Sequence, residues 1–143
     1  YGMAGLRVGY AIGEKDLILN FEKIRNHFGM SRISQVGALA ALEDYDFISD
    51  VINKVKLSRN RIGEIANNNN CKFIPSFTNF VAIDCLKDSK FAKKVLENLI
   101  NNGVFVRMPY SYPQNRCIRV TVGLDKDIDL FEKYFPIALK NAN

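Results

Sequence analysis

The sequence predicts an α/β protein in which helices pack on a short sheet, and three features of the chain support this. Apolar residues recur at spacings of three and four through most of residues 15–66, which is typical of amphipathic helices. After the asparagine run at residues 67–70 the apolar period changes to two, which indicates strands. A further helical segment then separates two pairs of strand-like segments, so helices and strands share one small unit.

The amino-terminal elements begin with a strand-like segment. Residues Leu6–Gly13 (LRVGYAIG) alternate well enough to predict a strand. The apolar spacing predicts a helix over Lys15–Phe28 and another over residues 31–45, which either Ser31 or Ser34 can cap. A lone strand exposes unpaired backbone groups and is not stable by itself. We therefore expect the partners of the first strand to lie outside this sequence, in a larger protein.

A long helix and two short strands are expected in the middle of the chain. Helical spacing continues for about five turns over residues 47–66, with Asp46 as the predicted cap. Asparagine competes for backbone hydrogen bonds and tolerates left-handed conformations, so the run at residues 67–70 should end this helix. Alternation around Pro75 then predicts strands over residues 71–76 and 79–85.

The carboxyl-terminal part repeats this mixture of elements. It is expected to form a helix, two strands and a final helix, over residues 90–100, 104–109, 117–123 and 125–142. Ser89 is the predicted cap of the first helix, and Gly103 is expected to close it. Pro136 should kink or break the last helix, because proline lacks the N–H that an interior helical position needs.

Composition narrows the possible partners of the protein. The chain has 143 residues, a net charge of +5, 48% hydrophobic and 24% charged residues, as in ordinary globular domains. Its basic residues are scattered, so we expect no nucleic-acid partner, and no apolar run reaches the roughly 18–20 residues of a membrane span.

Three separated cysteines favour a reducing compartment, the cytoplasm, over a disulfide framework. The single histidine, His27, makes no metal-binding pattern with them.

Three arginines are candidates for binding anions. Arg7 follows a glycine-rich turn at the mouth of the first strand, and its planar fork suits a phosphate. Arg119 alternates with Ile118 and Val120, so it should face away from the apolar side of its strand. Arg107 alternates in the same way with the apolar residues Val104 and Val106. Alternation alone fits either two solvated arginines on an exposed sheet face or a cleft wall that carries anion receptors.

The opening motif YGMAGLRVGYAIG closely resembles the segment after the cofactor lysine in pyridoxal-phosphate-dependent aminotransferases of classes I and II. The motifs SQVGALAALED, PSFTNFVAID, NNGVFVRMP and CIRVTVG follow in the order that this family shows. The combination of GVFVR and IRVTVG is most similar to the histidinol-phosphate aminotransferase branch. In the family pattern the Schiff-base lysine lies two residues before Tyr1, so the resemblance implies that this chain contains no catalytic residue and is inactive alone.

The resemblance also implies roles for four residues, all toward the cofactor pyridoxal 5'-phosphate or the substrate. Arg7 would bind the cofactor phosphate. Arg119 would hold an anionic group of the substrate such as an α-carboxylate, and Arg107 would hold a substrate phosphate. Asn79 would lie near the substrate carboxylate, although an asparagine beside a strand can also simply satisfy a turn. The intact protein would transfer an amino group from a donor, glutamate by expectation, and would be a homodimer.

By the same resemblance, residues 1–45 would complete a large cofactor-binding domain, and residues 46–143 would form a small α+β domain. Three alternatives stay open at this point. The parent protein could be another amino-acid aminotransferase, or a pyridoxal-phosphate-dependent decarboxylase of the same fold. It could also be a transcription regulator whose aminotransferase-like domain senses a ligand without turnover. The residues of this chain do not distinguish these possibilities.

Overall fold

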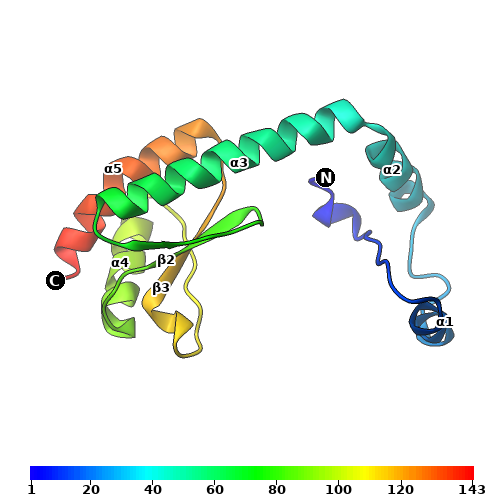
Figure 1. The fold of residues 1–143 in the computed structure, drawn as a ribbon, viewed down its shortest axis with the longest axis horizontal. Helices are drawn as coiled ribbons and strands as arrows, with labels where there is room; N and C mark the ends of the chain where they lie inside the picture. The colour runs from blue at the N-terminus through cyan, green and yellow to red at the C-terminus, as the bar shows by residue number, and fades with distance from the viewer. The chain divides into compact units, whose positions relative to one another are not determined.

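The computed structural model describes residues 1–143, which form two compact units, Tyr1–Val51 and Ile52–Asn143 (Figure 1). The boundary between the units falls inside the long helix α3, Tyr45–Asn68. None of the helices combines the length and the apolar composition that crossing a membrane requires. The assignment of residues 1–45 to a large domain and of residues 46–143 to a small one stays a prediction.

The first unit contains the 3₁₀ turn η1 (Ala4–Leu6) and the helices α1 (Lys15–Ile24) and α2 (Arg32–Glu43). The Ser31 hydroxyl accepts from the Ser34 backbone N–H at 3.0 Å, which confirms Ser31 as the cap of α2. The Ser34 hydroxyl donates to the Leu6 carbonyl at 2.6 Å. A methyl group at Gly37 would come within 3.1 Å of Leu6 Cδ1, so glycine lets η1 lie close against α2.

The predicted strand over Leu6–Gly13 is wrong. Leu6 ends η1, Arg7 has a left-handed backbone with φ 53°, and residues 8–13 belong to no helix or strand. The only sheet of the chain has three strands, and none of them lies in the first unit. A strand is defined by its hydrogen bonds to a neighbouring strand, so alternation without such a neighbour produces no strand here.

The first helix also ends earlier than its apolar spacing predicts. α1 stops at Ile24, and Arg25 already has an extended backbone. The side chain of Asn26 accepts from the Phe28 N–H at 3.0 Å, and the Asn26 carbonyl accepts from the Gly29 N–H at 3.1 Å. Asparagine therefore offers these backbone groups a turn in place of the last helical turn.

The second unit is built on a three-stranded antiparallel sheet in the order β1-β2-β3, with β1 at Lys72–Ile74, β2 at Phe80–Asp84 and β3 at Cys117–Thr121. The pairs Phe73 with Ile83 and Ala82 with Arg119 fix its register. All three strands were predicted from the period of two. The asparagine run also ends α3 as expected, with Asn70 in the left-handed region at φ 57°.

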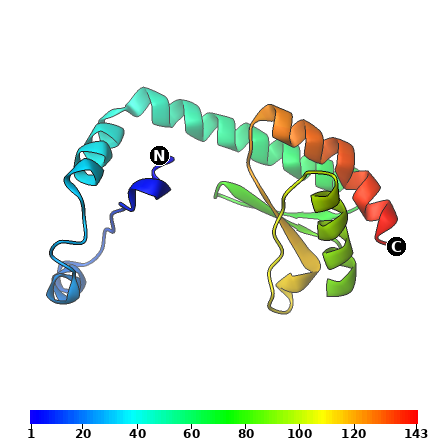
Figure 2. The same cartoon turned by 180° about the vertical axis from the view of Figure 1, so that it is seen from behind.

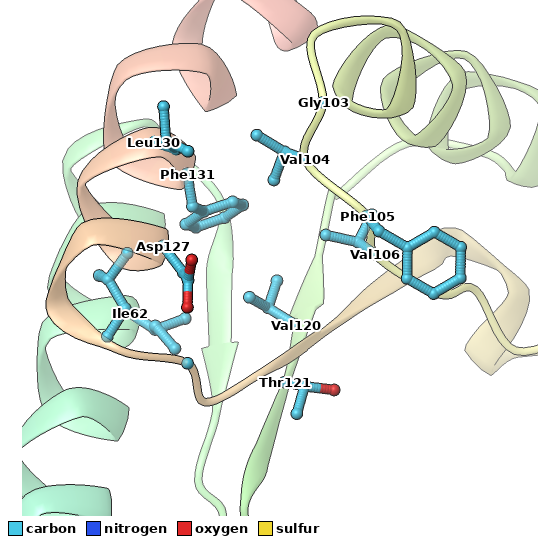
Figure 3. A pocket seen from close by; sticks show the side chains of 12 residues that line it. Ile62, Gly103, Val104, Phe105, Val106, Val120, Thr121, Asp127, Leu130 and Phe131 are labelled. Atoms are coloured by element: carbon cyan, nitrogen blue, oxygen red, sulfur yellow. The ribbon is translucent and has the colours of Figure 1, made fainter.

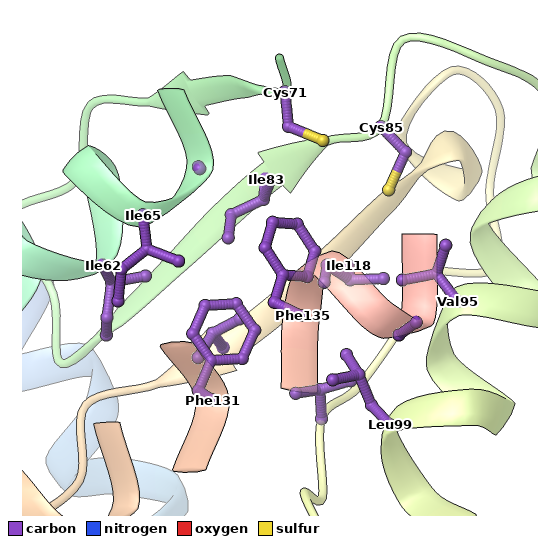
Figure 4. Close-up of a cluster of buried hydrophobic side chains, with 14 of the residues drawn as sticks. Ile62, Ile65, Cys71, Ile83, Cys85, Val95, Leu99, Ile118, Phe131 and Phe135 are labelled. Carbon is purple, nitrogen blue, oxygen red and sulfur yellow. The ribbon is translucent and has the colours of Figure 1, made fainter. Parts of the chain in front are cut away.

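One face of this sheet forms the core of the second unit (Figure 4). The second half of α3, α4 (Ser89–Asn101) and α5 (Asp125–Asn141) supply the rest of that core, as Figures 1 and 2 show from two sides. Its largest fully buried side chains are Phe131, Phe135, Ile62, Ile83, Leu99, Ile118, Val81 and Val95. The opposite sheet face carries Arg119 and Thr121, which are only partly covered or exposed.

Two predicted helix caps are shifted by one or two residues. Asp44, not Asp46, caps α3, because its carboxylate accepts from the Phe47 N–H at 3.0 Å. Asp88, not Ser89, caps α4, because its carboxylate accepts from the Phe91 N–H at 2.8 Å. In both cases an aspartate stands just before the helix, and its ionised oxygen is a strong acceptor for the free N–H groups of the first turn.

Asp88→Ala should destabilise the second unit by about 0.5–2 kcal/mol, because α4 loses its capping bond. Hydrogen exchange of the Phe91 amide in the intact protein should accelerate accordingly. Ser89→Ala is the matched control, since the Ser89 hydroxyl makes no hydrogen bond in the chain. A larger effect of the Ser89 change than of the Asp88 change would contradict this placement of the cap.

Two further expectations need correction. Residues 104–109 form no strand but a single antiparallel bridge, Arg107 with Arg119. Pro109 is opposite Cys117 when this register is extended, and it has no N–H, so the ladder cannot continue in that direction. Of the two outcomes expected at Pro136, a kink or a break, the break is wrong, since α5 runs continuously from Asp125 to Asn141. Phe135 and Ala138 on either side of this proline are fully buried and hold the helix in place.

Candidate ligand-binding site

Arg107 and Arg119 lie directly opposite each other at the edge of the sheet. The Arg107 N–H donates to the Arg119 carbonyl at 3.0 Å, and the Arg119 N–H donates to the Arg107 carbonyl at 2.6 Å. In such a hydrogen-bonded antiparallel pair the two side chains leave the same face, with their Cα atoms about 5.5 Å apart. The fold therefore brings both predicted anion receptors together on the sheet face that the helices leave uncovered.

The guanidinium of Arg119 is held by an aromatic ring. Its Cζ atom lies 4.8 Å from the centre of the Phe80 ring. Ala82, which is opposite Arg119 in the register, is too small to reach the guanidinium. Stacking on an aromatic face fixes the plane of the guanidinium and leaves its edge to make hydrogen bonds.

The Nε atom of Arg119 is buried and has no hydrogen-bond partner within the chain. A buried N–H without an acceptor costs free energy, so such a group calls for an acceptor from elsewhere. A carboxylate or phosphate oxygen would supply this acceptor, together with the opposite charge. This orphaned N–H distinguishes Arg119 from an ordinary solvated arginine.

A pocket of about 800 Å³ joins both arginines to the flank of α4. It is lined by Lys93, Leu96, Ile100, Phe105, Val106, Arg107, Met108, Pro109, Tyr110 and Arg119. Three of these side chains are cationic and none is acidic, while most of the others are apolar. The pocket therefore suits a ligand that combines an anionic group with an apolar or aromatic body.

Asn79 stands just before β2 and is tied to the end of β3. Its carbonyl accepts from the Val122 N–H at 2.9 Å. Its side-chain amide is exposed and makes no hydrogen bond within the chain, so it is available to a ligand. The side chain of Asn79 does not satisfy the turn, because the hydroxyls of Ser76 and Thr78 do so instead. The Ser76 hydroxyl donates to the Phe80 carbonyl and accepts from the Thr78 N–H, and the Thr78 hydroxyl accepts from the Phe80 N–H.

Arg7 lies in the first unit, whereas Arg107, Arg119 and Asn79 lie in the second. Arg7 is exposed, and its Nη1 donates to the Ala4 carbonyl at 2.7 Å. This bond closes the turn and uses one N–H, which leaves the other guanidinium donors for a ligand. A pocket of about 450 Å³ in this unit is lined mainly by apolar residues of α2 and of the segments on either side of η1, and Arg7 is not part of its lining.

The pocket around Arg107 and Arg119 is called the arginine site below. Two of its residues were not predicted from the sequence. Phe80 supplies the ring under Arg119, and Lys93 adds a third cation to the pocket. Phe80 is on the same sheet face as Arg119 only because the register pairs Phe80 with Thr121, two residues further along β3. Lys93 comes from α4, and its place depends on how this helix packs, which no local pattern encodes.

A second, smaller pocket of about 200 Å³ lies between α3, α5 and the segment after α4 (Figure 3). Ile62, Val104, Val120 and Phe131 give it an apolar wall. Its one carboxylate, Asp127, already accepts from the Leu124 N–H at 3.0 Å and so serves the start of α5. The cationic side chains and the orphaned Nε–H line the other pocket, so the arginine site remains the candidate.

Comparison with known proteins agrees with the family that the sequence motifs resemble. The family model described as aminotransferase class I and II matches residues 1–130. Histidinol-phosphate aminotransferase of Aliarcobacter butzleri is 37% identical over 86% of this chain and 33% of its own length. Histidinol-phosphate aminotransferase 2 of Legionella pneumophila strain Lens is 34% identical over 99% of this chain and 36% of its own length. The chain thus spans about a third of the curated relatives that it matches.

A solved structure of similar fold is histidinol-phosphate aminotransferase from Sinorhizobium meliloti in complex with pyridoxal-5'-phosphate. It superposes with a TM-score of 0.92 at 43% sequence identity. The match covers 100% of this chain and 39% of that one. The expected fold class is therefore confirmed, with helices packed on a small sheet in the second unit.

Proposed function

The chain belongs to the class I and II aminotransferase family, and we propose that it is the carboxyl-terminal part of an enzyme that moves an amino group between an amino donor and a keto acceptor. Glutamate is the proposed donor, and histidinol phosphate with its keto counterpart, imidazole acetol phosphate, is the proposed substrate pair. The observation that carries this proposal is the Arg107–Arg119 bridge, which presents two cations on one face. A substrate with two anionic ends, or with one phosphate and an aromatic body, fits that arrangement.

Pyridoxal 5'-phosphate is the proposed cofactor, and when bound it supplies an electron sink for negative charge at the α-carbon of the substrate. Arg7 is suited to bind the phosphate of the cofactor, because its guanidinium is exposed and only one of its N–H groups donates a hydrogen bond within the chain. The left-handed backbone of Arg7 at φ 53° turns the chain sharply at this point. This turn would present the side chain and the preceding glycine-rich backbone to the same anion.

The substrate anions would be divided between the paired arginines. Arg119 is fixed by Phe80 and has an unpaired buried N–H, so it is suited to hold a carboxylate in one orientation. Arg107 is exposed, lines the same pocket as the aromatic Tyr110, and is suited to bind the larger, more solvated phosphate group. The free side-chain amide of Asn79 would donate to the same carboxylate as Arg119. These residues bind and orient, and the proton transfers belong to groups outside this chain.

The lysine that carries the cofactor in this family is proposed to lie two residues before the position of Tyr1. Residues 1–143 by themselves should then bind no cofactor covalently and show no transaminase activity. We also propose that the intact protein is a cytoplasmic homodimer that binds neither nucleic acid nor membranes. The free thiol state of all three cysteines is consistent with a reducing compartment.

Arg7→Ala in the intact protein should weaken cofactor binding by roughly ten- to a hundredfold, since a charge-assisted bond to phosphate contributes about 1.5–3 kcal/mol. Spectroscopic titration with pyridoxal 5'-phosphate measures this directly. Arg25→Ala is the matched control, because Arg25 is an exposed arginine of the same unit that pairs with Glu22 at 2.8 Å. Unchanged cofactor affinity in the Arg7 variant would make Arg7 an ordinary surface residue.

A further inference from the structure

The three cysteines gather at one end of the sheet in the second unit. Cys71 immediately precedes β1, Cys85 immediately follows β2, and Cys117 begins β3. All three are buried free thiols. Nothing in the proposed aminotransferase chemistry uses them, so their grouping needs a separate explanation.

Cys71 and Cys85 are direct cross-strand neighbours. The antiparallel register pairs Lys72 with Asp84, and extending it by one residue places Cys71 opposite Cys85. Figure 4 shows both side chains at the same end of the core, beyond Ile83. Both side chains belong to the same buried hydrophobic cluster, so the two thiols lie on one face of the sheet.

The backbone around this pair sets the spacing that a disulfide needs. The Cys71 N–H donates to the Ala66 carbonyl at 3.0 Å, and the Cys85 N–H donates to the Arg116 carbonyl at 3.2 Å. Neither N–H therefore bonds to the opposite cysteine, which makes this a non-hydrogen-bonded pair. In such pairs the Cα atoms are about 4.5 Å apart, and disulfides span Cα separations of about 4.4–6.8 Å.

Cys117 is separated from this pair although it is close in the sheet. It is opposite Asp84 in the register and therefore shares the face of Asp84. Cys71 and Cys85 belong to the hydrophobic core cluster on the other face, and Cys117 does not. Successive residues of a strand alternate between faces, so Cys117 is not aligned with either thiol of the pair.

We propose that Cys71 and Cys85 are a redox-active pair that forms a reversible disulfide across β1 and β2. The oxidant is a low-molecular-weight disulfide such as oxidised glutathione. The Cys71 thiolate attacks one of its sulfur atoms and releases one glutathione thiolate, which leaves a mixed disulfide on Cys71. The Cys85 thiol then gives its proton to the glutathione thiolate released in the first step, attacks the Cys71 sulfur and expels the second glutathione as a thiolate.

The order of these two steps follows from the opposite directions in which the pKa values of the two neighbouring thiols are shifted. The neighbouring Cys85 side chain lowers the pKa of Cys71 below the usual value of a thiol, although burial opposes this. The neighbouring Cys71 side chain raises the pKa of Cys85, and burial adds to the increase. Cys71 therefore has the larger thiolate fraction and is the attacking sulfur, and Cys85 resolves the mixed disulfide.

Oxidation of the folded intact protein by oxidised glutathione, followed by acid quenching, alkylation in urea and tryptic mapping, tests this proposal. Trypsin places the three cysteines in the separate peptides Ile62–Lys72, Phe73–Lys87 and Cys117–Arg119. We expect the first two peptides to be linked, with loss of two hydrogen masses, and the third to be alkylated. Dithiothreitol should restore both thiols.

Two variants extend the test. Cys117→Ser should form the same linked peptide as the unaltered protein, and Cys85→Ser should stop at a glutathione adduct on Cys71. The proposal is overturned if all three cysteines of the unaltered protein remain alkylated, if Cys117 enters the linkage, or if the linkage appears only when urea is present during oxidation. A Cys85→Ser protein that carries no adduct on Cys71 would overturn the order of attack.

Discussion

Arg119→Lys in the intact enzyme is expected to lower kcat/KM for the amino donor by about tenfold to a thousandfold, which is roughly 1.4–4 kcal/mol of transition-state stabilisation. Lysine keeps the charge but lacks both the planar fork and the Nε–H that Arg119 holds buried and unpaired. It also loses the stacked geometry over Phe80. Steady-state kinetics with glutamate measures the effect, and cofactor affinity should barely change.

The comparison variant is Arg107→Ala, which removes the other half of the arginine pair. It should impair a phosphorylated substrate much more than glutamate, because Arg107 is proposed to bind the substrate phosphate. Equal impairment of both substrates by both variants would refute this division between the arginines. If neither substitution mattered, both would be solvated arginines on an open sheet face.

Phe135→Ala should destabilise the second unit by about 3–5 kcal/mol, the largest loss of stability expected from a single change here. Phe135 is fully buried in α5, and its ring stacks on Phe131 with 4.8 Å between ring centres. Truncation leaves a cavity between α5 and the sheet that the surrounding side chains cannot fill.

Hydrogen exchange of the β2 amides in the intact protein reports this loss, because these amides open only when the core of the second unit unfolds. Phe77→Ala is the matched control: it deletes the same atoms from a side chain that is 95% exposed. Protection of β2 that falls equally in both variants would contradict the assignment of this core.

Local patterns predicted the elements that are stabilised by their own amphipathic face. The strands at 72–74, 80–84 and 117–121 and the helices α4 and α5 follow directly from periods of two and of three to four. The spacing also placed Arg107 and Arg119 on the outward faces of their segments. In each of these cases the residues that decide the structure are neighbours in sequence.

Features that depend on distant residues could not be read in this way. The alternation of Leu6–Gly13 does not reveal whether another strand is available to pair with it, and in this chain none is. The pairing of Arg107 with Arg119 depends on the path of the chain between them. The caps at Asp44 and Asp88 differ from the predicted ones by one or two residues, because several polar side chains near a helix start compete for the same N–H groups.

The central claim is that this chain supplies the substrate-anion site of an aminotransferase, and amino transfer by the intact protein tests it most directly. With pyridoxal 5'-phosphate bound, histidinol phosphate and 2-oxoglutarate should yield glutamate in equal amount to the histidinol phosphate consumed, without release of carbon dioxide. Arg107→Ala should strongly reduce this yield at limiting substrate. Binding of both substrates without glutamate formation would instead support a ligand-sensing domain, and release of carbon dioxide would support a decarboxylase; either result would contradict the account.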